Sequence, residues 1–330
     1  MEQAPFDPWL ADLIYTLGAA SVATWLGLLV RATEKPLVRY RPRRPVPWGW
    51  AGSLLAVLFV ALALGTWLLG GGDQPAAEQP TWQLGAYIVQ QTLFTGVFAA
   101  AIAAFYGATT RDLGLPVNAR DWGWCVVIGL VAWVASLLPV QGTQALLYTW
   151  LQAPSQHPLV QLVIEEPSPS LLAVAFVAAV IVAPVCEEII FRLLLQGWLE
   201  KLEDSVLGWR PAVPLVPLEL EESLWEEGPS MVGPATVPAK AADELLVPPR
   251  RGLLGLPYGW VPIVLSSLLF GLAHLGHGTD PIPLVLLGVI LGFTYQRTHK
   301  IVPSIVTHMA FNLLSMLVLW GTIVSGGVSQ

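Results

Sequence analysis

Eight apolar stretches, each close to the length of a membrane-spanning helix, constrain this sequence more than any other feature. They cover residues 10–31, 48–70, 82–107, 122–150, 170–198, 258–275, 281–297 and 301–325. A helix needs about 20 apolar residues to cross the hydrocarbon core of a bilayer. The sequence therefore predicts an all-α fold, a polytopic transmembrane helix bundle of about eight helices that are embedded in lipid.

The composition agrees with this prediction and excludes other classes of protein. Charged residues make up 12% of the chain, against roughly 25% in soluble domains, and hydrophobic residues make up 55%. A net charge of −7 with 16 Lys and Arg residues argues against a nucleic-acid partner, because such proteins need a basic surface. Cys125 and Cys186 lie in apolar runs and do not indicate a disulfide framework.

The basic residues are divided unevenly between the predicted loops. Fifteen of the 16 Lys and Arg residues follow the first, third, fifth or seventh stretch, and loops 71–81, 151–169 and 276–280 hold none. Cytoplasmic loops carry an excess of Lys and Arg. We therefore expect a multi-pass protein of a plasma or inner membrane, with both termini outside and the odd-numbered loops in the cytoplasm.

The segment 200–257 differs from the rest of the chain because it is rich in Pro, Glu and Asp. A segment of this composition buries too little apolar surface to offset the entropy of folding. We expect a disordered, acidic, Pro-rich cytoplasmic loop. It interrupts a C-terminal part, 170–325, that holds helices five to eight, and the N-terminal part, 1–169, holds helices one to four.

The fifth stretch contains three ionisable side chains, Glu187, Glu188 and Arg192. Each ionised group at the centre of a spanning helix costs about 2.5 to 3.5 kcal/mol, so such residues are functional candidates by default. Glu188 and Arg192 are four residues apart and share a helix face, which predicts an ion pair. A structural ion pair would explain these two residues alone, but it would not explain Glu187, which is turned away from them and is free for chemistry.

Further polar residues occur in the sixth and eighth stretches. The sixth ends at His274, and the eighth contains His308 and Asn312, four apart and on one helix face. A single histidine in a span is more often a partner in helix packing. Together with the fifth stretch, however, these residues form a set that is able to deprotonate a water and to stabilise an oxyanion, as acyl hydrolysis requires.

Other enzyme classes lack their signatures in this chain. There is no His-Glu-x-x-His zinc motif and no Gly-x-Ser-x-Gly nucleophile motif. His277 lies between two glycines and is interpreted as a loop residue. Gly288 and Gly292 form a Gly-x-x-x-Gly face that favours close helix packing. A transporter with a proton relay is poorly supported, because no pair of half-helices is evident.

Three motifs in this order, on separate helices, resemble the CPBP intramembrane protease family. The motifs are Glu187-Glu188-x-x-x-Arg192, Phe270-x-x-x-His274 and His308-x-x-x-Asn312. The family is also called the Abi or type II CAAX prenyl endopeptidase family and includes lysostaphin resistance protein A-like members. The resemblance covers roughly residues 170–320.

The resemblance implies an intramembrane endopeptidase that acts on membrane-associated or lipidated, CAAX-like substrates. In that picture Glu187 and His274 activate water, Glu188 and Arg192 support the site, and His308 with Asn312 stabilises the oxyanion. Members are labelled metalloproteases, so Glu187, His274 and His308 are candidate Zn²⁺ ligands, and a metal-free glutamate mechanism stays open. The expected partners are the lipid bilayer and a peptide or membrane-anchored protein substrate.

The alternative function is a non-catalytic immunity or scaffold protein that binds a peptide partner in the same cavity. The shared-site hypothesis also makes a geometric demand. Counting about 1.5 Å per residue, His274 lies roughly 24 Å along helix six, whereas His308 lies roughly 10 Å along helix eight. Helix six is therefore predicted to extend beyond the bilayer on the cytoplasmic side, because His274 must reach Glu187.

Overall fold

The computed structural model describes residues 8–32, 45–68, 80–151, 158–165, 168–209 and 251–324. Within these ranges the chain is all-α, as predicted, and the single β-bridge joins Arg251 and Pro257. The first helices are α1 (Pro8–Ala32), the 3₁₀ turn η1 (Trp50–Ser53) with α2 (Leu54–Leu68), α3 (Pro80–Tyr106), α4 (Ala119–Leu151) and the short α5 (Pro158–Glu165).

The C-terminal part begins with one unbroken helical stretch of changing pitch. It consists of α6 (Pro169–Phe176), the π-helix η2 (Val177–Val182), α7 (Ala183–Glu188), the π-helix η3 (Ile189–Gln196) and α8 (Gly197–Leu207). After the 3₁₀ turn η4 (Leu253–Gly255) follow α11 (Trp260–Leu272), α12 (Pro281–Thr298) and α13 (Ile301–Val324). Each of the eight predicted stretches corresponds to a helix or to one such stretch, so the predicted fold class is confirmed.

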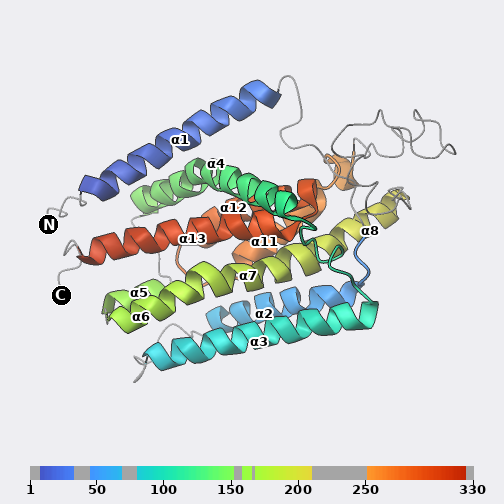
Figure 1. Ribbon diagram of the computed structural model, residues 1–330, viewed down its shortest axis with the longest axis horizontal. Helices are drawn as coiled ribbons and strands as arrows, with labels where there is room; N and C mark the ends of the chain where they lie inside the picture. The colour runs from blue at the N-terminus through green and yellow to red at the C-terminus, as the bar shows by residue number, and fades with distance from the viewer. Residues whose placement is uncertain are drawn as a thin grey trace.

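The helices run roughly parallel or antiparallel in one bundle (Figure 1). α13 packs between α4 and α7, while α2 and α3 lie on the other side of α7, and α11 and α12 pack against each other. Five of the helical segments are long and apolar enough to span a membrane: Pro8–Arg31, Leu84–Tyr106, Ala119–Leu151, Pro169–Leu207 and Ile301–Val324. The protein is thus an integral, multi-pass membrane protein.

The predicted disordered loop 200–257 needs correction at both ends. α8 continues as a helix to Leu207, and residues 251–257 hold the 3₁₀ turn η4 and the Arg251–Pro257 bridge, while residues 210–250 lie outside the described residues. α5 was not predicted, because its eight residues are too few to cross a bilayer. The division of the chain into parts 1–169 and 170–325 stays a prediction.

The main hydrophobic core surrounds the middle of the long helical stretch. Ile190, Phe191 and Leu194 of η3 are at most 1% exposed and pack with Leu55 of α2 and Phe270 of α11. Elsewhere large apolar side chains face outward, as expected of a surface that contacts lipid tails rather than water. The core thus fixes the part of the stretch that carries the predicted site.

Candidate functional site

Glu187 and Glu188 lie at the end of α7, a short α-helical turn between two π-helices. Pro184 occupies the first turn of α7, and because proline has no N–H and crowds the carbonyl one turn earlier, a change in pitch at this point relieves the clash. π-Helical turns are rare and occur frequently at functional sites. The irregular pitch therefore sets the directions in which the two neighbouring carboxylates point.

Glu188 is fully buried between a cation and an imidazole. Arg192 Nε donates to Glu188 Oε2 at 3.2 Å, and both side chains are 0% exposed. The other carboxylate oxygen, Oε1, lies 3.1 Å from His308 Nδ1. The predicted ion pair is confirmed, and the same carboxylate also links α7 to α13.

Glu187 points to two histidine nitrogens from other helices. Its Oε1 lies 4.0 Å from His274 Nε2, and its Oε2 lies 3.8 Å from His308 Nε2. These separations exceed direct hydrogen-bond lengths and suit a small bridging group. Glu187 and His274 keep 12% and 13% of their side-chain surface accessible, whereas Glu188 has none. The structure thus brings Glu187, His274 and His308 together, as the shared-site hypothesis requires.

The hydrogen bonds at Nδ1 determine which nitrogen of each histidine carries the proton. His274 Nδ1 lies 2.8 Å from the Phe270 carbonyl oxygen, and His308 Nδ1 faces the Glu188 carboxylate. Both partners are acceptors, so each Nδ1 is the donor and each neutral imidazole leaves Nε2 bare. Two proton acceptors and one carboxylate therefore face the same space.

His274 reaches the site because α11 begins farther out than α13. Gly259 N donates to Glu203 Oε2 at 3.0 Å, and the Tyr258 hydroxyl donates to Asp204 at 2.6 Å, so α11 starts level with the end of α8. Fifteen residues from Gly259 to His274 then span about 22 Å, against about 10 Å from the start of α13 to His308. The start of α11 thus lies beside α8, and the extension of helix six beyond the bilayer stays a prediction.

Phe270 packs at the centre of this cluster and is fully buried. Its ring centroid is 5.0 Å from that of His274 and 5.7 Å from that of His308. The Arg192 guanidinium carbon lies 5.3 Å from the same ring centroid, a cation–π arrangement. One aromatic side chain thus separates the two imidazoles and covers the guanidinium.

Asn312 lies one turn after His308 but is engaged elsewhere. Its Nδ2 donates to the Ala179 carbonyl oxygen of η2 at 2.8 Å. This bond satisfies a backbone group in a stretch of non-standard helical pitch. The predicted contribution of Asn312 to oxyanion binding stays a prediction.

Three polar residues near the site were not singled out from the sequence. Ser266 of α11 and Gln196 of η3 are fully buried beside Arg192, and Gln196 also bonds Glu200. A signal was present, because Gln196 and Glu200 continue the four-residue spacing of Glu188 and Arg192 through an apolar stretch. No comparable periodicity marks Ser266, which follows from tertiary packing.

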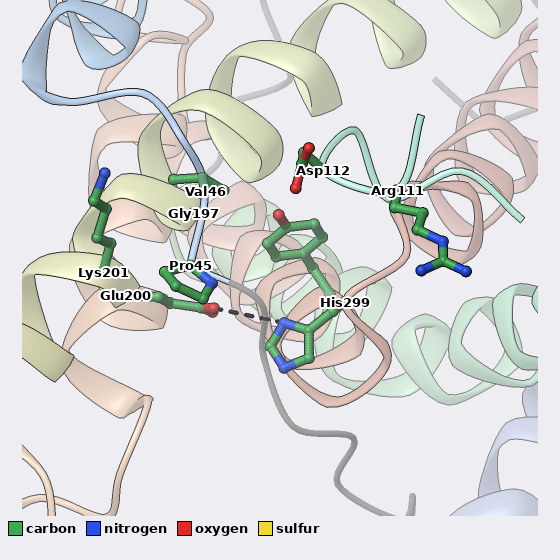
Figure 2. A pocket seen from close by; sticks show the side chains of 9 residues that line it. Pro45, Val46, Arg111, Asp112, Gly197, Glu200, Lys201 and His299 are labelled. Atoms are coloured by element: carbon green, nitrogen blue, oxygen red, sulfur yellow. Dashed lines mark ion pairs between the residues drawn. The ribbon is translucent and has the colours of Figure 1, made fainter. Parts of the chain in front are cut away.

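Four polar side chains lie at four-residue intervals along the long helical stretch: Glu188, Arg192, Gln196 and Glu200. The last of them, Glu200, lines a pocket between α8 and the end of α12. Figure 2 shows Glu200 and His299 facing each other there, with Oε2 and Nδ1 3.8 Å apart. Lys201, Arg111 and Asp112 also line this pocket. It is separate from the space between Glu187 and the two histidines.

His277 lies in the turn between α11 and α12, as interpreted from the sequence. Its ring nevertheless packs edge-on against His274, with the centroids 5.6 Å apart. The prediction that it is a loop residue is confirmed, but the loop folds back on the site. Its flanking Gly276 and Gly278 both have positive φ values, which explains the glycines that signalled the turn.

The donor types at the site match those that Zn²⁺ uses in proteins. Bare imidazole nitrogens whose Nδ1 is held by an acceptor, together with a carboxylate, are the donors that zinc sites use. Among the described residues, however, no three His, Cys, Asp or Glu side chains are grouped closely enough to hold a metal ion. The chemistry below is therefore derived from the side chains alone.

One comparison with known proteins finds a match in this part of the chain. Residues 169–218 and 247–314 match the family model described as type II CAAX prenyl endopeptidase Rce1-like. No curated protein and no solved structure matches the chain. The two matched segments contain all six of the predicted site residues: Glu187, Glu188, Arg192, His274, His308 and Asn312.

Proposed function

Because the chain belongs to the family of type II CAAX prenyl endopeptidases, the CPBP intramembrane proteases, we propose that it hydrolyses peptide bonds with a water activated by Glu187 and His274. The observation that carries this proposal is the position of the Glu187 carboxylate, 3.8 and 4.0 Å from two imidazole Nε2 atoms. A water in that space would have two or three acceptors for its protons, which is the requirement for a hydrolytic nucleophile.

The proposed reaction transfers one proton from the water to the leaving amine. The water oxygen attacks the scissile carbonyl carbon while Glu187 or His274 Nε2 takes its proton. The tetrahedral intermediate then collapses, the carbon–nitrogen bond breaks, and the proton passes to the leaving amine. The acid product gains the OH of the water and the amine product gains its H, so the step needs no further reactant.

His308 supports the negative oxygen of the intermediate only in its doubly protonated form. Its Nδ1–H is committed to Glu188, so Nε2 must also carry a proton to donate to an oxyanion. Glu188 Oε1 lies 3.1 Å from His308 Nδ1, and Glu187 Oε2 lies 3.8 Å from His308 Nε2. Glu188 and Arg192 therefore act on the reaction through the orientation of His308.

The proposed substrates are peptides or membrane-anchored proteins, including proteins with a lipidated, CAAX-like C-terminus. In such a terminus the cysteine carries a prenyl group and precedes the residues that are removed. Cleavage of a prenylated peptide by the purified chain, and not of the same peptide without the lipid, would support this class. Zn²⁺ bound by Glu187, His274 and His308 stays a prediction, which metal analysis of the purified protein tests.

The proteolytic function is tested by comparing protein termini in cells that carry the wild-type chain or Glu187→Gln at equal abundance. Glutamine keeps the shape of the side chain but cannot accept the proton, so a defined set of new termini should disappear. Glu165→Gln is the matched control, because Glu165 is an exposed carboxylate at the end of α5. It should leave the set of termini unchanged.

The alternative, a non-catalytic immunity or scaffold protein, makes the opposite prediction. A protein that only binds a partner would tolerate Glu187→Gln, and the terminus profiles of the two strains would match while both forms stay folded. That result would contradict the proposed function.

A further inference from the structure

A buried polar network extends from Glu188 beyond the residues of the three motifs. Arg192 Nη1 donates to Ser266 Oγ at 3.1 Å, and Ser266 Oγ lies 3.2 Å from Gln196 Oε1. All three side chains are 0% exposed. Two of them, Ser266 and Gln196, have no part in the chemistry described above.

The amide of Gln196 is held in one orientation. Its Nε2 donates to Glu200 Oε1 at 3.0 Å and to the Gly292 carbonyl oxygen at 2.9 Å. Both partners are acceptors, and an amide nitrogen has two protons, so rotation of the amide would set oxygen against oxygen. The carbonyl oxygen Oε1 must therefore face Ser266.

This orientation in turn fixes the hydroxyl of Ser266. Because the hydroxyl accepts from the guanidinium, its own proton must go to another acceptor, and Gln196 Oε1 and the Ile263 carbonyl oxygen both lie at 3.2 Å. Ser266 thus accepts one hydrogen bond from the Arg192 guanidinium and donates one to a carbonyl oxygen. The guanidinium is held at Nη1 by Ser266 and at Nε by Glu188.

These bonds matter because few other contacts orient the guanidinium. Within the described part of the chain, Arg192 Nη2 has no hydrogen-bond partner, and the guanidinium lies over the Phe270 ring. Arg192 holds the Glu188 carboxylate through its hydrogen bond to Oε2, and Glu188 in turn holds the His308 imidazole through Oε1. A guanidinium that turned away from Ser266 would carry Glu188 with it and release His308 Nδ1.

We propose that Ser266 and Gln196 are positioning residues, which hold Arg192 so that Glu188 keeps His308 oriented toward Glu187. This inference rests on the proposed function, because it assigns the two residues to the same reaction. It requires that they affect turnover through Arg192 without contact to the substrate.

The chain offers a matched control for Ser266. Ser267 is the next residue of α11, is equally buried, and donates to the same Ile263 carbonyl oxygen, at 2.6 Å. The hydrogen bonds of the Ser267 hydroxyl do not involve Arg192 or Gln196. Ser266→Ala and Ser267→Ala therefore remove the same atom from the same helix, and only the first breaks the network.

The experiment measures kcat, KM and the thermal unfolding temperature of the purified, full-length chain. The probe is a quenched-fluorescence peptide with a prenylated CAAX terminus, or a peptide of the sequence found by terminus profiling if that differs. Ser266→Ala should lower kcat about tenfold or more, as loss of a hydrogen bond to a charged group does, with KM unchanged. Ser267→Ala should keep the wild-type kcat.

Two further variants separate positioning from packing. Ser266→Cys leaves no cavity, because it replaces the hydroxyl by a somewhat larger sulfur, and since that sulfur hydrogen-bonds weakly it should also lower kcat. Gln196→Met should lower kcat less, because Ser266 can still donate to Ile263. The double variant Ser266→Ala/Gln196→Met should lose no more than Ser266→Ala alone, since both act through one guanidinium.

A wild-type kcat in both Ser266→Ala and Ser266→Cys would overturn the inference. Equal losses of kcat and of unfolding temperature in Ser266→Ala and Ser267→Ala would also overturn it, since they would indicate packing alone. In either case a wild-type chain that cleaves and a Glu187→Gln chain that does not would leave the proposed function intact. A wild-type chain that cleaves nothing would contradict the proposed function and the inference with it.

Discussion

Glu187 and Glu188 are adjacent in the chain, but the fold gives their carboxylates different neighbours. Glu188 is fully buried and bonded to Arg192 and His308, whereas Glu187 keeps part of its surface accessible and lies too far from either histidine for a direct hydrogen bond. Buried ion pairs cost desolvation energy and tolerate the loss of one partner poorly. The two glutamates should therefore differ in what their replacement does to stability.

We predict that Glu188→Gln destabilises the protein by about 3 kcal/mol or more, because it leaves the Arg192 charge buried without its anion. Glu187→Gln should change stability little, while it abolishes activity. Unfolding followed in detergent micelles measures both variants. The double variant Glu188→Leu/Arg192→Met removes the pair as a whole and should recover most of the lost stability without activity. Equal destabilisation by Glu187→Gln and Glu188→Gln would contradict this assignment.

At the scale of single residues, the sequence was sufficient to predict side-chain contacts within one helix and insufficient to predict contacts between helices. The Glu188–Arg192 pair follows from a spacing of four residues, and it is present. The approach of His274 to Glu187 was implied only by the resemblance, because no spacing relates residues on separate helices. Ser266 was missed for the same reason, since a serine in an apolar helix usually bonds its own backbone.

The close contact between α11 and α12 depends on glycines that face α11 and η3. A Cβ atom on Gly288 would lie 3.0 Å from Ser267 Cβ, and one on Gly292 would lie 2.8 Å from Gln196 Oε1 and 3.3 Å from Ile263 Cγ2. These separations confirm that the Gly-x-x-x-Gly face serves helix packing. Gly292 also leaves the space that the Gln196 amide occupies.

We predict that Gly292→Ala destabilises the protein by about 1 to 3 kcal/mol, the usual cost of overpacking. It should also lower kcat, because the added methyl group displaces Gln196. Gly96→Ala on α3 is the control, since a Cβ atom there meets nothing within 4 Å and alanine favours a helix over glycine by about 0.5 to 1 kcal/mol. Unfolding temperatures of the two variants should shift in opposite directions, and equal shifts would contradict the prediction.

Apolar length was a reliable guide to the helices and a poor guide to their pitch. All eight stretches form helices, and five of the helical segments are long and apolar enough to span a membrane. The two π-helices around α7 were not predicted, since their residues are as apolar as those of the α-helical turns beside them. Only Pro184 marked that region, and one proline does not say how the helix adjusts around it.

In the bundle, α1 begins and α13 ends at one end, and α1, α3, α8 and α12 end at the other (Figure 1). The long helical stretch from α6 to α8 connects these two ends, with the exposed Glu165 of α5 near its beginning and the exposed Ser205 near its end. This arrangement agrees with an even number of membrane crossings. It does not by itself say which end is cytoplasmic, so the orientation depends on the distribution of Lys and Arg.

We predict that the end with α8 is cytoplasmic and the end with α5 is external, because 15 of the 16 Lys and Arg residues follow the first, third, fifth or seventh apolar stretch, whose helices end at the α8 end. A membrane-impermeant thiol reagent tests this on intact cells with Glu165→Cys and Ser205→Cys. Glu165→Cys should react at once, and Ser205→Cys only after permeabilisation. The wild-type chain serves as the background, since Cys125 and Cys186 are both buried. The reverse labelling would invert the bundle, and the lipidated cytoplasmic proteins proposed as substrates would then face the wrong end of the protein.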